Sequence, residues 1–295
     1  MKKKIIFRGT GTALITPFRD GEIDFEALGR LIDLQISEKV DALIIGGTTG
    51  ESATLSDTER FKLYSFAKAK VDGRAKLILG TGTNDTRKVI EYTKFATSLG
   101  CDGVLIVTPY YNKGTEEGIY KHYISIAEST FLPTILYNVP SRTGVNLGLN
   151  LLSRLGEHEN IVAIKEASDS VDRLVSLSEL SDSLTLYAGN DSQIYPTLAL
   201  GGLGVISVIS NLLPRESADI CRLYFEGWHS ESLKQQQRLL PLIKAMFLET
   251  NPSPIKYAMS RLGLCSPELR LPLDEPREST KREIDRLLTE YITDG

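Results

Sequence analysis

Histidine and cysteine are scarce in this 295-residue sequence, and their scarcity excludes several kinds of site. The three histidines, His122, His158 and His229, are far apart, so they form no cluster of the kind that holds a catalytic metal ion. The three cysteines are an odd number and contain no C-x-x-C pair, which is typical of reduced thiols in the cytoplasm. We therefore expect a cytoplasmic protein with neither a disulfide framework nor a metal site.

Long apolar runs and long basic stripes are also missing. No apolar segment has the length of a membrane-spanning helix, and no series of lysines and arginines could follow a phosphate backbone. The 34 basic and 38 acidic residues give a net charge of −4, so we expect neither a membrane nor a nucleic acid as partner. The glycine clusters at Gly80–Gly82 and Gly201–Gly204 fall short of a dinucleotide-binding pattern and predict tight turns.

The sequence does contain short β-branched runs that alternate with longer amphipathic segments. Asp24–Glu38, for example, repeats apolar side chains at an approximate period of 3.6 residues, which predicts a helix. Eight strands are predicted, at Thr12–Ile15, Ala42–Ile45, Leu77–Gly80, Gly103–Val107, Thr134–Tyr137, Val162–Lys165, Thr185–Ala188 and Gly204–Val208. Strands joined by crossover helices form a parallel sheet, and eight such units fit a closed (β/α)8 TIM barrel. An open doubly wound sheet gives a similar pattern, but we favour the barrel.

Strand signals end after Leu213, and helical patterns follow. Ser232–Leu248 and Thr280–Ile292 are amphipathic, whereas Asn251–Pro254 and Ser266–Pro276 are rich in helix breakers. We therefore predict that residues 1–226 form a (β/α)8 catalytic domain and that residues 227–295 form a C-terminal helical region packed on the barrel. A fully separate domain is not favoured, because no linker rich in glycine, serine or proline marks a boundary.

Lys165 is the most informative single residue. It ends the apolar run Ile161–Ile164, which is typical of a buried parallel strand. Burial disfavours the charged form of a lysine, and a neutral amine can attack a ketone, so Lys165 is a candidate Schiff-base nucleophile. Its position alone does not separate this interpretation from a lysine that begins a surface loop.

Polar side chains follow several of the other predicted strands, and the active site of a (β/α)8 barrel is built at these strand ends. Gly46–Ser52 could hold a carboxylate with backbone N–H groups and hydroxyls, although a simple strand-to-helix turn would look similar. Thr108–Asn112 and Tyr137–Gly144 supply tyrosines and an arginine, which suit proton transfer and carboxylate binding. Small residues in Ala188–Asp191 leave room for a ligand. Together these segments are difficult to explain as packing alone.

Four motifs give the chain a resemblance to the pyruvate-dependent class I aldolase family that includes dihydrodipicolinate synthase and N-acetylneuraminate lyase. They are G-T-T-G-E-S at Gly47–Ser52, T-P-Y-Y-N at Thr108–Asn112, Y-N-V-P-S-R-T-G at Tyr137–Gly144 and I-K-E-A-S at Ile164–Ser168. Their order and approximate spacing are those of the family, and the resemblance runs nearly end to end. The paired threonines and Arg142 resemble the synthase branch rather than the sialate lyases.

The resemblance implies four catalytic residues. Lys165 would form an imine with pyruvate, and Thr48, Tyr137 and Tyr111 would relay protons. Family members place the tyrosine that matches Tyr111 across a subunit interface. The resemblance therefore implies at least a dimer, and we expect a homotetramer built as a dimer of dimers.

The resemblance also implies the substrates. Thr49 would hold the pyruvate carboxylate, Gly189 and Ile206 would line the pyruvate pocket, and Arg142 would bind the carboxylate of L-aspartate 4-semialdehyde. The product would be 4-hydroxy-tetrahydrodipicolinate, toward diaminopimelate and lysine, formed without a cofactor. The alternatives are a lyase or aldolase acting on a sugar acid such as N-acetylneuraminate or a keto-deoxy sugar acid, which Arg142 argues against, and a catalytically silent barrel that binds a keto acid.

One departure from the family concerns regulation. Lysine-inhibited members carry a glutamate at the position of Lys88 and a histidine or another lysine-compatible residue at the position of Arg60. In those members both positions belong to an allosteric cleft near the dimer interface. Four other positions of the cleft match the family, namely Ser52, Ala53, Asn84 and Tyr110. Two additional positive charges would repel the ammonium groups of lysine, so we predict weak or absent feedback inhibition.

Overall fold

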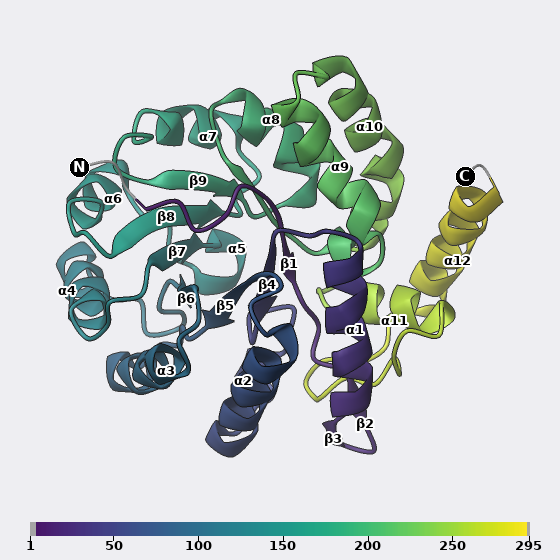
Figure 1. Ribbon diagram of the computed structural model, residues 1–295, viewed down its shortest axis with the longest axis horizontal. Coiled ribbons are helices and arrows are strands. Elements are labelled where there is room, and N and C mark those ends of the chain that lie inside the picture. The colour runs from purple at the N-terminus through teal and green to yellow at the C-terminus, as the bar shows by residue number, and fades with distance from the viewer. Residues whose placement is uncertain (1–3, 294–295) are drawn as a thin grey trace.

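Eight parallel strands close into a barrel in the computed structural model, which describes residues 4–293 (Figure 1). The strands are β1 (Gly9–Ala13), β4 (Ala42–Ile45), β5 (Lys76–Gly80), β6 (Gly103–Val107), β7 (Thr134–Asn138), β8 (Ile161–Glu166), β9 (Thr185–Ala188) and β10 (Gly204–Ser207). β1 pairs with both β4 and β10, so the sheet has no free edge. The predicted (β/α)8 barrel is confirmed, and the open sheet is wrong.

Helices follow the strands and surround the barrel. They are α1 (Phe25–Ser37), α2 (Asp57–Val71), α3 (Thr86–Leu99), α4 (Glu116–Ala127), α5 (Pro140–Thr143), α6 (Leu149–Leu155), α7 (Val171–Ser178), α8 (Ile194–Ala199) and α9 (Pro214–Phe225). Three 3₁₀ turns, Ser52–Thr54, Asp191–Gln193 and Ile209–Asn211, lie in the connections. The helix predicted at Asp24–Glu38 is confirmed as α1, and the Asp24 side chain caps it by accepting a hydrogen bond from the Ala27 N–H.

The first strand differs from its predicted position at Thr12–Ile15. β1 begins three residues earlier and includes Gly9 and Gly11, although glycine in a strand interior usually weakens the strand. In the barrel, β1 approaches β10 so closely that a Cβ atom on Gly204 would lie 1.8 Å from the carbonyl oxygen of Gly9. A Cβ atom on Gly9 would lie 2.0 Å from Asp41 Oδ2, and one on Gly11 would lie 2.8 Å from Ile44 Cδ1, so close packing explains the glycines of β1.

A short hairpin between β1 and α1 was also missed. β2 (Phe18–Arg19) pairs antiparallel with β3 (Glu22–Ile23). The two residues between them, Asp20 and Gly21, have φ angles of 55° and 82°. Asp-Gly is a strong signal for a tight hairpin turn, so the sequence did contain the information for this element.

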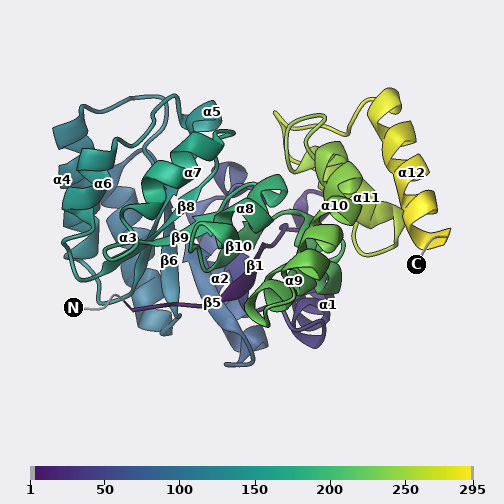
Figure 2. The same cartoon turned by 90° about the horizontal axis from the view of Figure 1, so that it is seen from above.

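Three further helices extend the chain beyond the barrel: α10 (His229–Ala245), α11 (Ser253–Arg261) and α12 (Glu278–Thr293). Figure 2 shows them together on one side of the barrel, with α12 outermost. The helices expected at Ser232–Leu248 and Thr280–Ile292 are present as α10 and α12, with shifted ends. α11 was missed because it begins in a breaker-rich segment, but proline is well tolerated in the first turn of a helix. None of the helices within residues 4–293 is long and apolar enough to cross a membrane.

The interior of the barrel is filled by side chains and is not a channel. Ile44, Ile78, Leu105 and Ile135 are all buried there. Phe7 and Tyr187 stack with their ring centroids 4.4 Å apart, and the Tyr187 hydroxyl donates to the Phe7 carbonyl over 2.6 Å. A ligand must therefore bind at an end of the barrel.

Candidate active site

A cavity of about 740 Å³ lies where β7, β8 and β9 end. Five of the eight predicted site residues line it: Thr49, Tyr137, Arg142, Lys165 and Gly189. They come from the loop after β4, from the ends of β7 and β8, from α5 and from the residue after β9. Residues spread over 140 positions of the sequence are thus brought to one place at the carboxyl ends of the strands.

Lys165 lies within β8 and is only 4% exposed, so it does not begin a surface loop. It stands beside Tyr137 of β7 in the strand register. The Lys165 Nζ atom is 4.3 Å from the centroid of the Tyr137 ring. The amine and the phenol ring are therefore neighbours at the base of the cavity.

The residue after Lys165 anchors the end of β8. Glu166 is completely buried, and its carboxylate accepts hydrogen bonds from Asn138 Nδ2 at 3.0 Å and from the Ser168 N–H at 2.9 Å. Arg173 Nε forms an ion pair with the same carboxylate at 3.3 Å. This network, which the sequence analysis did not single out, fixes the backbone from which the Lys165 side chain extends.

The glycine-rich loop after β4 holds Thr49, which is 3% exposed. Its hydroxyl oxygen accepts a hydrogen bond from Asn251 Nδ2 at 2.9 Å. Two backbone positions of the loop are left-handed, Gly46 with φ of 71° and Glu51 with φ of 52°. Glu51 is held in this conformation by contacts to the C-terminal helical region, because its carboxylate is paired with Lys256.

Arg142 lies at the rim of the cavity on the short helix α5 and is exposed. Its Nη2 atom donates to the carbonyl oxygen of Asn251 at 2.9 Å. Arg142 and Asn251 also line a second cavity of about 420 Å³, so the two cavities adjoin. Asn251 was missed by sequence reasoning, which assigned it only to a breaker-rich segment, and no local signal points to its contact with Thr49.

Asp191 is a further residue of the cavity wall, and it is 1% exposed. Burial raises the pKa of its carboxyl group, while hydrogen bonds oppose that shift. The Val208 and Ile209 N–H groups donate to Asp191 Oδ2 at 2.9 and 3.0 Å. From the sequence, Asp191 was predicted only as part of a strand end that leaves room for a ligand.

Three predicted site residues lie outside this cavity wall. Thr48 lines the adjoining cavity. Ile206 is fully buried inside the barrel, in the same apolar cluster as Tyr137. Tyr111 lies in the loop between β6 and α4 and is 89% exposed, so within its own chain it is a surface residue.

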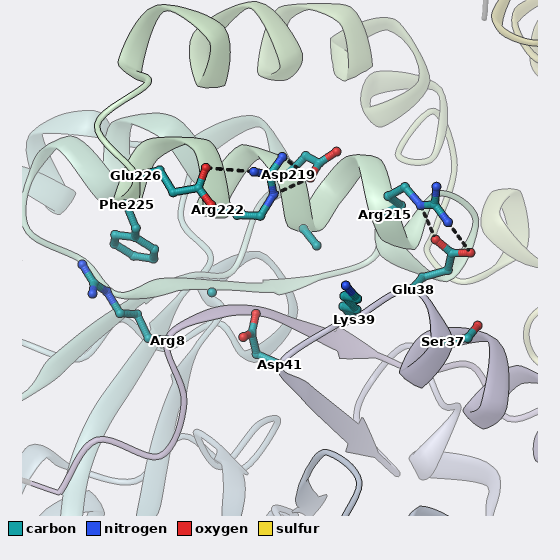
Figure 3. Close-up of a pocket in the computed structure, with 12 residues that line it drawn as sticks. Arg8, Ser37, Glu38, Lys39, Asp41, Arg215, Asp219, Arg222, Phe225 and Glu226 are labelled. Carbon is teal, nitrogen blue, oxygen red and sulfur yellow. Dashed lines mark hydrogen bonds and ion pairs between the residues drawn. The ribbon is translucent and has the colours of Figure 1, made fainter.

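Another cavity of about 740 Å³ lies at the opposite end of the barrel, where the strands begin (Figure 3). Arg8 directly precedes β1, and Asp41 directly precedes β4. Two arginines in its wall form ion pairs: Arg215 with Glu38, and Arg222 with both Asp219 and Glu226. Polar residues at this end of a (β/α)8 barrel contribute to stability rather than to catalysis, so this cavity is not part of the candidate site.

A (β/α)8 barrel with a buried lysine at the carboxyl end of a strand defines a candidate Schiff-base enzyme. A sequence model of the Dihydrodipicolinate synthetase family matches residues 6–291. The chain therefore belongs to this family, and the predicted resemblance is confirmed.

Individual relatives agree with this assignment. The 4-hydroxy-tetrahydrodipicolinate synthase of Thermotoga sp. strain RQ2 is 46% identical over 290 residues, which cover 97% of this chain and 99% of that protein. The synthase of Clostridium novyi is 44% identical over 287 residues, 97% of each chain. The crystal structure of dihydrodipicolinate synthase from Thermotoga maritima has a TM-score of 0.95 at 44% identity, covering 97% of this chain and 99% of that one.

Proposed function

We propose that the protein is a lyase that condenses pyruvate with L-aspartate 4-semialdehyde to form 4-hydroxy-tetrahydrodipicolinate, on the route to diaminopimelate and lysine. The observation that carries the proposal is the position of Lys165, buried beside Tyr137 and opening on a cavity that also holds Arg142. Relatives named 4-hydroxy-tetrahydrodipicolinate synthase support the choice of reaction.

The reaction begins when the neutral Lys165 amine attacks the ketone carbon of pyruvate. Loss of water gives an imine, and loss of a methyl proton converts the imine to an enamine. The enamine carbon then forms a bond to the aldehyde carbon of the second substrate. Finally the substrate's own amine attacks the imine carbon, which closes the ring and releases Lys165. No cofactor is needed, because the protonated imine formed on Lys165 is itself the electron sink.

Protons must move at several of these steps, and the tyrosines are suited to move them. Tyr137 lies beside the Lys165 amine, where its hydroxyl can exchange protons with the carbinolamine. Thr48 and Tyr111 would complete the relay. Thr48 lines the adjoining cavity, which shares Arg142 and Asn251 with the cavity that holds Tyr137.

The residues around the cavity suit the charge and the size of the two substrates. Thr49 would donate to the pyruvate carboxylate, while Gly189 and Ile206 would keep the pocket small and apolar. A Cβ atom on Gly189 would lie 2.6 Å from the Glu166 carbonyl oxygen, so no larger residue fits there. The exposed guanidinium of Arg142 would bind the carboxylate of the incoming aldehyde with two hydrogen bonds. Such a group favours the semialdehyde over a sugar acid.

The proposal includes a homotetramer in the cytoplasm. Tyr111 is an exposed aromatic residue with a φ of 70°, a strained conformation that is typical of functional positions. Val171 and Val175, one turn apart on α7, are 51% and 47% exposed and offer a second apolar contact. The cysteines are free thiols, which fits a reducing compartment.

The test is to incubate the protein with pyruvate and borohydride and to locate the adduct by peptide mass spectrometry. We expect a reduced pyruvyl group on Lys165 and none in a folded Lys165→Ala variant. Addition of L-aspartate 4-semialdehyde without borohydride should then yield the cyclic product. An adduct without condensation would favour the sugar-acid alternative, and no adduct in folded protein would overturn the proposal.

A further inference from the structure

Asn251 joins the two groups that the proposed function assigns to the two substrate carboxylates. Its side-chain amide donates to the Thr49 hydroxyl oxygen at 2.9 Å, and its backbone carbonyl oxygen accepts from Arg142 Nη2 at 2.9 Å. Asn251 is 5% exposed and lines both adjoining cavities. It comes from the segment between α10 and α11, outside the barrel strands.

The direction of the bond to Thr49 has a chemical consequence. A hydroxyl group has one proton and two lone pairs. Because Asn251 occupies a lone pair of Thr49 Oγ1, the hydroxyl proton of Thr49 remains free to donate elsewhere. A substrate carboxylate accepts hydrogen bonds and cannot donate them when it is ionised. The amide of Asn251 therefore orients the Thr49 hydroxyl so that the hydroxyl can donate its proton to a carboxylate.

The surroundings of Asn251 also point to a ligand. Its Oδ1 atom is buried and has no hydrogen-bond partner within residues 4–293. Buried polar atoms in folded proteins almost always have a partner, so an unpaired one in a cavity wall is typical of a group completed by a ligand or by water. The bond from Arg142 goes to the backbone of Asn251 and leaves the remaining guanidinium N–H groups for a second carboxylate.

We infer that Asn251 is a positioning residue that holds the Thr49 hydroxyl as a donor to the pyruvate carboxylate. This inference rests on the proposed function. It assigns the C-terminal helical region a part in substrate binding, through a residue 202 positions away from Thr49 in the sequence.

Two substitutions separate this role from a structural one. Asn251→Ala removes the donor, and we expect the KM for pyruvate to rise about 10-fold. Asn251→Asp keeps the shape but makes the side chain an acceptor, so Thr49 would turn its proton toward residue 251. The added negative charge would also repel pyruvate, and we expect a rise of about 100-fold. A structural role predicts the reverse order, because aspartate is the closer replacement in shape.

In Asn251→Ala the KM for L-aspartate 4-semialdehyde should change less than about 3-fold, because Arg142 contacts the backbone carbonyl of residue 251. Asn160→Ala is the matched control. Asn160 donates two side-chain hydrogen bonds, to Ala127 and Thr130 carbonyls, at the far end of β8. We expect it to leave both KM values unchanged.

The assay is steady-state condensation kinetics, with borohydride trapping of pyruvate and thermal unfolding measured on each variant. A pyruvate KM that is unchanged in Asn251→Ala, or lower in Asn251→Asp than in Asn251→Ala, would overturn the inference while wild-type trapping upholds the proposed function. Absence of trapping in the wild type would overturn both. If Asn251→Asp does not fold, Asn251→Ala on a Thr49→Val background decides: no further rise in pyruvate KM is expected, and an additive rise contradicts the inference.

Discussion

The ammonium group of Lys256 forms an ion pair with the carboxylate of Glu51, and both side chains are fully buried. Lys256 also donates to the Glu268 carbonyl oxygen at 2.8 Å, and Glu51 accepts from the Arg270 N–H at 3.0 Å. The pair connects α11 to the loop that carries Thr49. The C-terminal helical region is therefore attached to the loop that carries Thr49 by a buried ion pair.

Lys256→Met should lower the free energy of unfolding by about 3–5 kcal/mol, because it leaves the Glu51 carboxylate buried without a counter-charge. Urea denaturation measures the change. Lys76→Met is the control, since Lys76 pairs with Asp102 at the surface, where its side chain is 52% exposed, and its loss should cost less than about 1 kcal/mol. An equal decrease in the free energy of unfolding in the two variants would mean that burial of the Lys256–Glu51 pair adds nothing to stability.

His122 should make stability depend on pH. It is 6% exposed on α4, its Nδ1 atom is 2.9 Å from Thr86 Oγ1, and burial lowers its pKa from 6.5 to about 4. Between these two values the unfolded chain binds a proton that the folded protein does not. The free energy of unfolding should therefore fall as pH is lowered through this range, by up to about 3 kcal/mol from this residue.

The measurement is the difference between the wild type and His122→Gln in urea denaturation at several pH values between neutrality and pH 4. Carboxyl groups titrate in both proteins, so their contribution is shared. We expect the wild type to lose more stability on acidification. Parallel pH profiles would show that His122 binds a proton equally well in the folded state.

The sequence was sufficient to predict the barrel and the buried position of Lys165, but not all contacts of the candidate site. Barrel strands such as β8 are short apolar runs between helical patterns, and that information is local. The first strand was predicted at Thr12–Ile15 and lies at Gly9–Ala13, because its glycines are explained only by packing against residues such as Asp41 and Ile44 that are distant in the sequence. The bond from Asn251 to Thr49 depends on how α11 packs on the barrel, and no local pattern encodes a contact over 202 positions.

Lysine should inhibit the enzyme weakly or not at all. Lys88 Nζ forms ion pairs with Asp57 at 2.5 Å and Glu91 at 3.2 Å, and hydrogen bonding to Asp57 raises the pKa of Lys88. Arg60 is 5% exposed and donates to the Ser52 carbonyl at 2.6 Å. Arg60 lines the same cavity as Ser52 and Tyr110, and its fixed positive charge would repel an ammonium ligand there.

Condensation rates at increasing lysine concentration test this prediction, and inhibition at sub-millimolar lysine would contradict it. Lys88→Glu should increase sensitivity by replacing a repulsive charge with an attractive one. Lys94→Glu is the matched control, because Lys94 is an exposed lysine on the same helix, α3. It changes the net charge equally and should leave the response to lysine unaltered.

Tyr111 should act in the site of a neighbouring subunit, since in its own chain it is 89% exposed. Tyr111→Phe removes the hydroxyl and should lower kcat about 100-fold, the scale of a lost proton-transfer group. Co-expression of Tyr111→Phe with Lys165→Ala tests whether Tyr111 acts in its own subunit or in a neighbouring one. In a mixed dimer, one site would combine an intact Lys165 with an intact Tyr111 from its neighbour.

Random pairing should then restore about a quarter of wild-type activity, because half of the dimers are mixed and each has one complete site. Separately purified variants that are mixed without subunit exchange provide the control and should show no recovery. If Tyr111 served its own subunit, every site would lack one of the two groups. Activity would then stay at the average of the two parent variants, and the tyrosine would have to reach Lys165 by a movement of its own loop.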